Sequence, residues 1–231
     1  NADSLNNIFY YKNKIFAYNQ TMNCIVAYDL AAQNLSKISD RFDIEISRIK
    51  DLLVVDDTVY VLFVPIQFFD NNDEIHNFGK ADENGFIDYN EKLYSINISD
   101  GKMTDLNIDN IINIYKAASG DIFYYAYVDK NYGLYHIDKR TGESKKISDL
   151  NDIGYIESFI YEGNNFTYIT GNSLYNKDFR NGEINMLEPD LNYAYASKVY
   201  LYSGHLIYLE YLTDTADSIT SQKSKVTSRY I

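Results

Sequence analysis

The sequence predicts an all-β protein built from repeated four-stranded antiparallel units, and three observations support this. Leu-Tyr pairs begin at Leu93, Leu134 and Leu174, which are 41 and 40 residues apart. Each pair is followed by an Asp-Gly, Thr-Gly or Asn-Gly turn. Tyr and Phe contribute 24 and 12 of the 231 residues, and aromatic residues favour strands. A period near 40 with several short strands in each unit is typical of β-propeller blades.

One apolar strand type recurs in five places along the chain. Its copies cover residues 14–18, 58–62, 121–125, 165–169 and 205–209. Each copy follows a residue that tolerates the backbone angles of a tight hairpin: Asn13, Asp57, Gly120, Asn164 and Gly204. We therefore predict a single propeller domain over residues 3–231. Its five units cover approximately 7–40, 48–108, 111–149, 155–189 and 197–231.

We label the strands of each unit A to D from the inside outward. The fourth unit is the clearest, with strands predicted at 156–161, 165–170, 173–178 and 183–187. Gly101, Gly142 and Gly182 occupy the C–D turn, where a positive φ costs glycine little. The first unit has Gln33-Asn34 in place of this glycine, and we expect the asparagine to adopt that geometry.

The apolar runs are nearly continuous, as in residues 58–64. A sheet with one solvated face would alternate apolar and polar residues, so we expect both faces of each sheet to be packed. Ile108, Ile111, Ile112 and Tyr115 follow a helical spacing. The repeat register instead predicts a D–A connection followed by strand A, and we favour the strand.

Two segments interrupt the period, at residues 65–91 in the second unit and 213–225 in the fifth. Both fall between strands B and C, and long loops are usually functional or mobile. In a propeller, B–C and D–A loops emerge on one face, so we expect the two insertions to share it. The fifth unit lacks a strand D. A closed five-bladed ring is one explanation, and we favour the other, that the chain is part of a six- to eight-bladed ring.

Composition excludes some classes of function. A net charge of −12 and a pI near 4.6 argue against binding nucleic acid or anionic lipid through a basic surface. The sequence contains no run of 18 apolar residues, the length needed to span a membrane as a helix. Cys24 is the only cysteine, so no intrachain disulfide forms, and its apolar strand predicts a buried, inert thiol. We expect Asn1-Ala2 to be a tag remnant, with any native signal or anchor absent from this chain.

The third unit carries a family resemblance through residues 121–125, 133–138 and 141–147. This unit resembles a family of bacterial β-propeller repeats whose function is unassigned. That family is distantly similar to the YWTD propellers of the low-density-lipoprotein receptor, although the YWTD tetrad itself is absent here. The resemblance implies a secreted or cell-surface bacterial binding module and supplies no catalytic residues.

The first insertion holds the candidate ligand-binding residues: Phe68, Phe69, Asp70, His76 and Phe78. Aromatic side chains on a long loop either pack back onto the fold or present a contact surface, and packing back is favoured because exposed apolar patches are rare. If these rings are exposed, they are the strongest partner-binding candidates in the chain. The three histidines show no metal-ligand spacing, and we predict no metal site.

Residues 80–91 partly match a calcium-binding loop. With Gly85 at loop position 6, oxygen ligands would come from Asp82, Asn84, Asp88 and Glu91. However, Lys80 stands where an aspartate ligand is expected, and no convincing helices flank the loop. A polar hairpin loop with an Asn-Gly turn is the alternative. We therefore predict no cofactor and keep calcium as an open alternative.

No serine-hydrolase, phosphate-loop or zinc-protease motif is present. The leading hypothesis is thus a non-enzymatic extracellular or cell-surface module that binds a protein or glycan through loops on one propeller face. One alternative is a glycoside hydrolase or lyase with carboxylates gathered at the channel mouth. Another is a structural scaffold domain of a larger surface protein.

Overall fold

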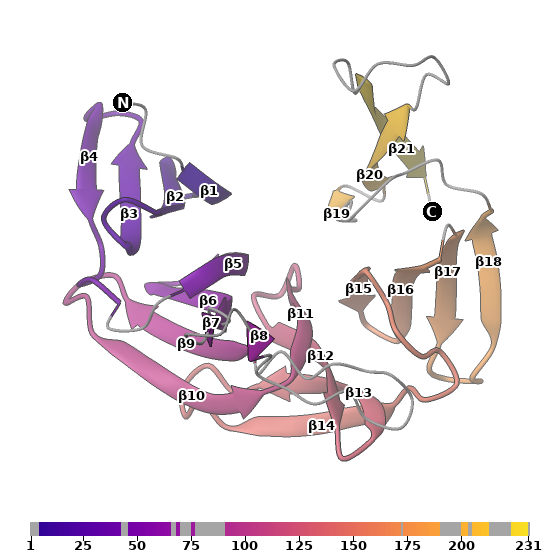
Figure 1. Cartoon of the computed structure of the whole chain (residues 1–231). Helices are drawn as coiled ribbons and strands as arrows, with labels where there is room; N and C mark the ends of the chain where they lie inside the picture. Colours follow the sequence, from indigo (N-terminus) through magenta and orange to yellow (C-terminus); the bar gives the residue numbers. More distant parts are fainter. Residues whose placement is uncertain are drawn as a thin grey trace. The chain divides into compact units, whose positions relative to one another are not determined.

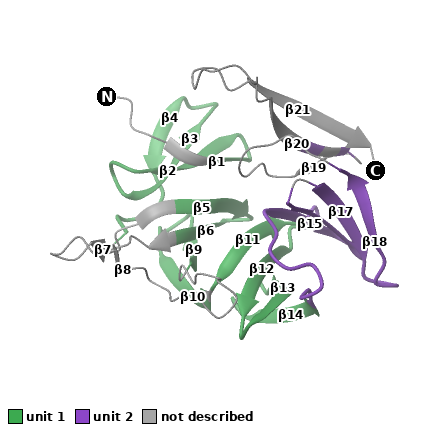
Figure 2. Cartoon of the chain, turned by 45° about the vertical axis from the view of Figure 1, so that its right-hand side comes forward, with its two compact units in different colours: residues 1–116, 120–148 green, residues 117–119, 149–231 purple. Residues whose placement is uncertain are grey.

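The computed structural model describes residues 5–42, 46–65, 68–69, 75–76, 91–171, 173–189, 200–202, 205–212 and 223–230. The chain divides into two compact units (Figure 2). Unit 1 contains residues 1–116 and 120–148, and unit 2 contains residues 117–119 and 149–231. All regular elements in the described ranges are β-strands (Figure 1). The single-domain arrangement stays a prediction.

Unit 1 carries three four-stranded sheets. The first has the order β1 (Leu5–Tyr11), β2 (Lys14–Asn19), β3 (Cys24–Asp29) and β4 (Asn34–Lys37). The second has the order β5 (Ile46–Val55), β6 (Thr58–Pro65), β9 (Lys92–Asn97) and β10 (Met103–Asp109). The third has the order β11 (Ile111–Lys116), β12 (Ile122–Val128), β13 (Asn131–Ile137) and β14 (Ser144–Asp149).

Unit 2 carries one four-stranded and one three-stranded sheet within its described residues. The fourth sheet has the order β15 (Ser158–Glu162), β16 (Asn165–Thr170), β17 (Ser173–Asp178) and β18 (Ile184–Glu188). The fifth has the order β19 (Tyr200–Tyr202), β20 (His205–Leu212) and β21 (Lys223–Tyr230). The five predicted B strands are β2, β6, β12, β16 and β20, and each lies second in its sheet. The predicted repeat register is therefore confirmed.

The segment with helical spacing is also a strand. Residues 111–116 form β11, which pairs antiparallel with β12 and places Asn113 opposite Tyr125. Ile108 belongs to β10 and not to a connector, because a single residue, Asn110, separates β10 from β11. Asn110 makes this tight link with a φ of +60°, which asparagine tolerates better than most residues.

Strand β6 shows why the apolar runs are continuous. Val59, Val61 and Phe63 are buried in a cluster with residues of the first sheet, including Phe16 and Ile25. The intervening Tyr60 and Leu62 are buried in a second cluster with residues of the third sheet, such as Ile111 and Ile122. Successive side chains of a strand point to opposite faces, so both faces of this sheet are covered. The predicted two-sided packing is confirmed for the second sheet.

Lys116 connects the first strands of all three sheets in unit 1. Its Nζ donates a hydrogen bond to the carbonyl of Val54 in β5 at 3.1 Å. The same Nζ lies 4.7 Å from the Tyr11 ring centroid and 5.8 Å from that of Phe9, both in β1. A cation over an aromatic face is stabilised by the ring quadrupole, so Lys116 holds β1, β5 and β11 together.

In unit 2, aromatic rings fill the core of the fourth sheet. The Phe166 ring lies 5.4 Å from Phe159, 5.9 Å from Phe179 and 5.5 Å from Tyr168, measured between centroids. Such spacings are those of favourable aromatic pairs. The chain lacks Trp, so Phe and Tyr supply the large apolar surface that these blades bury.

The hairpin turns partly correct the sequence assignments. Positive φ is found at Asn13 and Gly120, as expected for the A–B turns. In the second and fourth sheets the predicted residues Asp57 and Asn164 also lie in the turn, and the positive φ falls at the residue before each, Asp56 and Gly163. In the C–D turn of the first sheet, Gln33 has a φ of +51°, so glutamine and not the expected asparagine takes the left-handed position.

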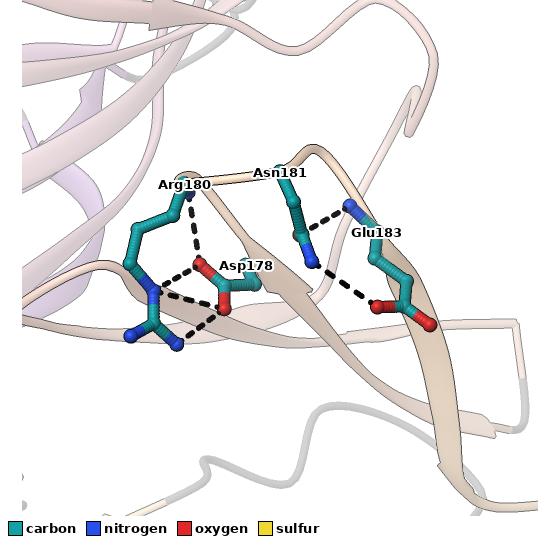
Figure 3. Close-up of polar contacts among 4 residues, drawn as sticks. All are labelled: Asp178, Arg180, Asn181 and Glu183. Carbon is teal, nitrogen blue, oxygen red and sulfur yellow. Dashed lines mark hydrogen bonds and ion pairs between the residues drawn. The ribbon is translucent and has the colours of Figure 1, made fainter.

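The C–D turns of the second, third and fourth sheets share one hydrogen-bonded design. Gly101, Gly142 and Gly182 have φ of +70°, +75° and +75°, as predicted. Each glycine N–H donates to the carbonyl four residues earlier, at 2.9, 2.7 and 2.8 Å respectively. In the fourth sheet, Figure 3 shows how side chains complete the turn: Asp178 Oδ1 accepts the Arg180 N–H at 2.9 Å, and Asn181 Oδ1 accepts the Glu183 N–H at 3.0 Å.

Candidate binding surface at the insertion

The insertion of the second sheet begins where β6 ends, at Pro65, and β9 resumes at Lys92. Near its start it forms a small two-stranded ladder of β7 (Phe68–Phe69) and β8 (Ile75–His76). Phe68 pairs with His76, and Phe69 pairs with Ile75. Three of the five predicted ligand-binding residues, Phe68, Phe69 and His76, are thus brought onto one ladder. Asp70 and Phe78 lie outside the described residues.

A buried ion pair closes the insertion at its other end. Glu91 precedes β9, and its Oε1 lies 2.6 Å from the Nζ of Lys50 in β5. The Glu91 side chain is only 6% exposed and that of Lys50 only 21%. A carboxylate in such a site requires a partner, because an isolated buried charge is strongly unfavourable. This pair therefore ties the end of the loop to the first strand of its own sheet.

Aromatic rings stiffen the sheet below the insertion. The ring of Phe63, near the end of β6, lies 5.0 Å from that of Tyr94 in β9. Phe42, in the connection before β5, lies 6.3 Å from both Phe63 and Tyr18. Phe63 and Phe42 are almost fully buried. The sheet is therefore tightly packed next to the insertion. This packing favours a defined position for the end of β6 and the start of β9, which flank the insertion.

Other B–C connections in the described chain are short. In the first sheet four residues separate β2 from β3, and Asn19 Oδ1 accepts the Met22 N–H at 2.9 Å. In the third sheet only Asp129 and Lys130 separate β12 from β13, and both have positive φ. The second insertion, expected at 213–225, overlaps β21 at its end, and its residues 213–222 lie outside the described ranges.

Most ligands of the alternative calcium site lie outside the described residues. Asp82, Asn84 and Asp88 lie outside the described residues, whereas Glu91 is paired with Lys50. Within the described chain, no three His, Cys, Asp or Glu side chains come together as a potential metal site. Calcium at this loop therefore stays a proposal.

One further acidic residue, Glu157 in unit 2, has an unusual environment. It directly precedes β15, and its N–H donates to the Ile169 carbonyl at 3.0 Å. Its Oε2 is buried without a hydrogen-bond partner, the one such side-chain atom found in the described residues. Burial raises the pKa of this carboxyl above its usual value, and the bond to its own N–H opposes that shift only partly.

Other carboxyls behave in the opposite way. Hydrogen bonds from the Arg180 side chain and N–H hold the pKa of Asp178 below its usual value. The N–H groups of Arg140 and Thr141 do the same for Asp138. These aspartates stabilise turns in their charged form. The pKa of Glu157 is thus shifted towards the protonated form, whereas the pKa values of these aspartates are shifted towards the charged form.

The remaining candidates are structural. Cys24 is fully buried, and desolvation raises the pKa of its thiol, so it is not an activated nucleophile. His136 lies in β13 with its Nε2 3.6 Å from Asp121 Oδ1, and His205 begins β20, as the sequence indicated.

Sequence reasoning missed Lys50 and Glu157. Each is a charged residue within an apolar strand region, which is a usable signal for a buried or functional group. The signal does not name the partner, because Lys50 and Glu91 are 41 positions apart.

Comparison with known proteins defines the fold. No family model and no curated protein matches the chain. Among solved structures, the chain is similar to a β-propeller in the crystal structure of the nidogen/laminin complex, with a TM-score of 0.59 and 9% identity over 90% of this chain and 72% of that one. It is also similar to TolB from Acinetobacter baumannii, with a TM-score of 0.62 and 12% identity over 98% of this chain. It spans about half (52%) of the TolB chain.

A third similar structure is a candidate gluconolactonase, with a TM-score of 0.57 and 11% identity over 98% of this chain and 74% of that one. Together with the four-stranded antiparallel sheets, these similarities show that the chain has the all-β fold of propeller blades. At such low identity they show the fold alone. Among the described residues, no helix has the length and apolar character to cross a membrane.

Proposed function

We propose that the chain is a non-enzymatic binding module of a bacterial secreted or cell-surface protein. It recognises a protein or glycan through the insertion of the second sheet. The observation that carries the proposal is the contrast within unit 1. One B–C connection extends into a ladder bearing Phe68, Phe69 and His76, while the corresponding connections of the first and third sheets are short turns.

The base of the insertion supports this function. A recognition loop gains affinity when its ends are held in place, because less conformational entropy is lost on binding. Lys50–Glu91 and Phe63–Tyr94 hold those ends. Aromatic side chains dominate binding energy at protein interfaces and also stack on sugar rings, so Phe68, Phe69 and Phe78 are the proposed anchors. The extracellular location rests on the resemblance of the third unit to bacterial surface propeller repeats.

The test uses a glycan array and an array of purified proteins. One variant replaces residues 66–90 by a two-residue turn and keeps Pro65 and Glu91, so that the Lys50 pair survives. A second variant carries Phe68→Ala and Phe69→Ala. The matched control is Tyr10→Ala, which removes an aromatic ring that is 63% exposed on β1. We expect both insertion variants to lose the ligand and the control to keep it. Unchanged binding by the shortened variant would refute the proposal.

A second candidate function rests on Glu157. A carboxyl with a raised pKa is a typical general acid, which favours a hydrolase or lyase of the kind considered from the sequence. One of the similar structures is a candidate gluconolactonase, so the fold is compatible with catalysis. Turnover of a panel of glycosides and lactones by the wild type, abolished by Glu157→Gln, would support an enzyme. Absence of turnover would leave the binding module as the function.

A further inference from the structure

The three glycine-containing C–D turns hold different residues at the position before the glycine. Asp100 Oδ1 accepts the Lys102 N–H at 2.9 Å. Thr141 Oγ1 accepts the Glu143 N–H at 3.2 Å, and Asn181 Oδ1 accepts the Glu183 N–H at 3.0 Å. Aspartate, threonine and asparagine thus make the same contact in the same turn. The side-chain oxygen is what the turn requires, and the rest of the group is free to differ.

Asn181 differs from the other two residues in its chemistry. It precedes a glycine, which lacks a side chain that would hinder approach to the backbone nitrogen. The Gly182 nitrogen can attack Asn181 Cγ, losing its proton as the C–N bond forms and ammonia leaves. Water then opens the cyclic imide to an aspartyl or isoaspartyl residue. Asn181 and Gly182 are both exposed at the end of the hairpin, so water has access to them.

We propose that Asn181 is a site of spontaneous deamidation, at which the folded turn slows the reaction and accepts the aspartyl product. The product is accepted because Asp100 already makes the equivalent hydrogen bond in the second sheet. The new charge replaces the amide that now donates to Glu183 Oε2 at 3.2 Å (Figure 3). Deamidation therefore removes one exposed hydrogen bond and adds a repulsion between the new carboxylate and that of Glu183. Both effects are small in water.

The turn slows the reaction because it restrains both reacting groups. The Gly182 N–H is donated to the Asp178 carbonyl at 2.8 Å, and the Asn181 amide is held by Glu183 at both its oxygen and its nitrogen. Opening two of these hydrogen bonds slows the reaction by about fivefold to a hundredfold.

The experiment incubates the whole chain in mildly alkaline buffer, with and without denaturant, and follows peptide masses. Asn84-Gly85 is the other Asn-Gly pair in the sequence, and its mass gain in denaturant serves as the internal reference that the conditions support deamidation. We expect the peptide containing Asn181 to gain about 1 Da in the native chain, about tenfold more slowly than in denaturant. Asn181→Thr, which copies Thr141, should abolish the gain in this peptide.

Acceptance of the product is tested separately with Asn181→Asp, which copies Asp100. Its Tm should stay within about 3 °C of the wild type, the shift expected for less than about 1 kcal/mol in a chain of this size. A native chain that never gains mass at Asn181, or one that gains it as fast as the denatured chain, would contradict the proposal. So would a large loss of Tm in Asn181→Asp.

Discussion

The connections at the two ends of the third strand of each sheet differ sharply in how much they vary. At the C–D turns, the second, third and fourth sheets repeat one backbone pattern, with a left-handed glycine and an N–H donated four residues back. At the B–C connections, the second sheet extends from Pro65 to Lys92 while the third turns within two residues. The C–D turns form a constrained end with a shared local structure, whereas the B–C connections form a tolerant end that accepts changes in length. Loops of this tolerant kind are where binding residues concentrate.

The largest expected loss of stability lies at the constrained end, where two glycines of the C–D turns can be compared. A Cβ at Gly101 would lie 2.8 Å from the Ile38 carbonyl oxygen, whereas one at Gly182 would meet nothing within 4 Å. Both residues have positive φ, so alanine is strained at either site by about 1–2 kcal/mol. We expect Gly182→Ala to cost that amount and Gly101→Ala about 2–4 kcal/mol, because the clash adds to the strain. Urea denaturation measures both, and equal costs would show that the Ile38 contact relaxes freely.

The next effect tests the base of the tolerant end. Lys50→Ala leaves the Glu91 carboxylate buried without its partner. We expect a loss of about 2–3 kcal/mol in the free energy of unfolding, somewhat less than for a fully buried pair, since Lys50 is partly exposed. Lys92→Ala is the matched control. Its ion pair with Asp105 spans 4.0 Å between side chains that are 32% and 31% exposed, and it should contribute less than about 1 kcal/mol. If the two variants lose equal stability, the Lys50 pair does not anchor the insertion.

The smallest effect concerns Glu157 and depends on pH. Because burial raises its folded-state pKa, the folded protein keeps this proton at pH values where the unfolded chain has lost it. The resulting stability is present below the unfolded pKa, near 4.5, and is lost as the pH rises through the folded pKa. Glu157→Gln should therefore flatten the fall in stability above that pH and stabilise the protein at neutral pH by up to about 1 kcal/mol. A pH series of thermal melts measures this, with Glu143→Gln, an exposed turn residue, as the control. An unchanged pH profile would place Glu157 in contact with water.

Much of the fold was predictable because local patterns determine it. The B strands were found from apolar runs following turn residues, and the positive φ of Gly101, Gly142 and Gly182 followed from the glycines themselves. An error was also local. Gln33 takes the left-handed position expected of Asn34, since neighbouring polar residues in one turn cannot be distinguished by residue type alone. Helical spacing at 108–115 was overridden by pairing between β11 and β12, a tertiary effect.

The candidate site was less predictable. Phe68, Phe69 and His76 were selected because the insertion breaks the repeat, and β7 and β8 bring them onto one ladder. The burial of Glu91 depends on Lys50, which lies in a strand that the sequence pattern does not place beside it. The apolar sequence around Glu157 hints at burial, but the missing partner of its Oε2 is a property of the fold. Long-range partners decide such properties, and a single sequence does not record them.

The single-residue link at Asn110 has a mechanical consequence. Edge strand β10 of the second sheet continues into edge strand β11 of the third with only one residue between them. Each residue of a chain extends by no more than about 3.6 Å, so this joint has almost no slack. A stretching load that reaches β10 passes to β11 before the link can lengthen. The second and third sheets therefore bear tension together.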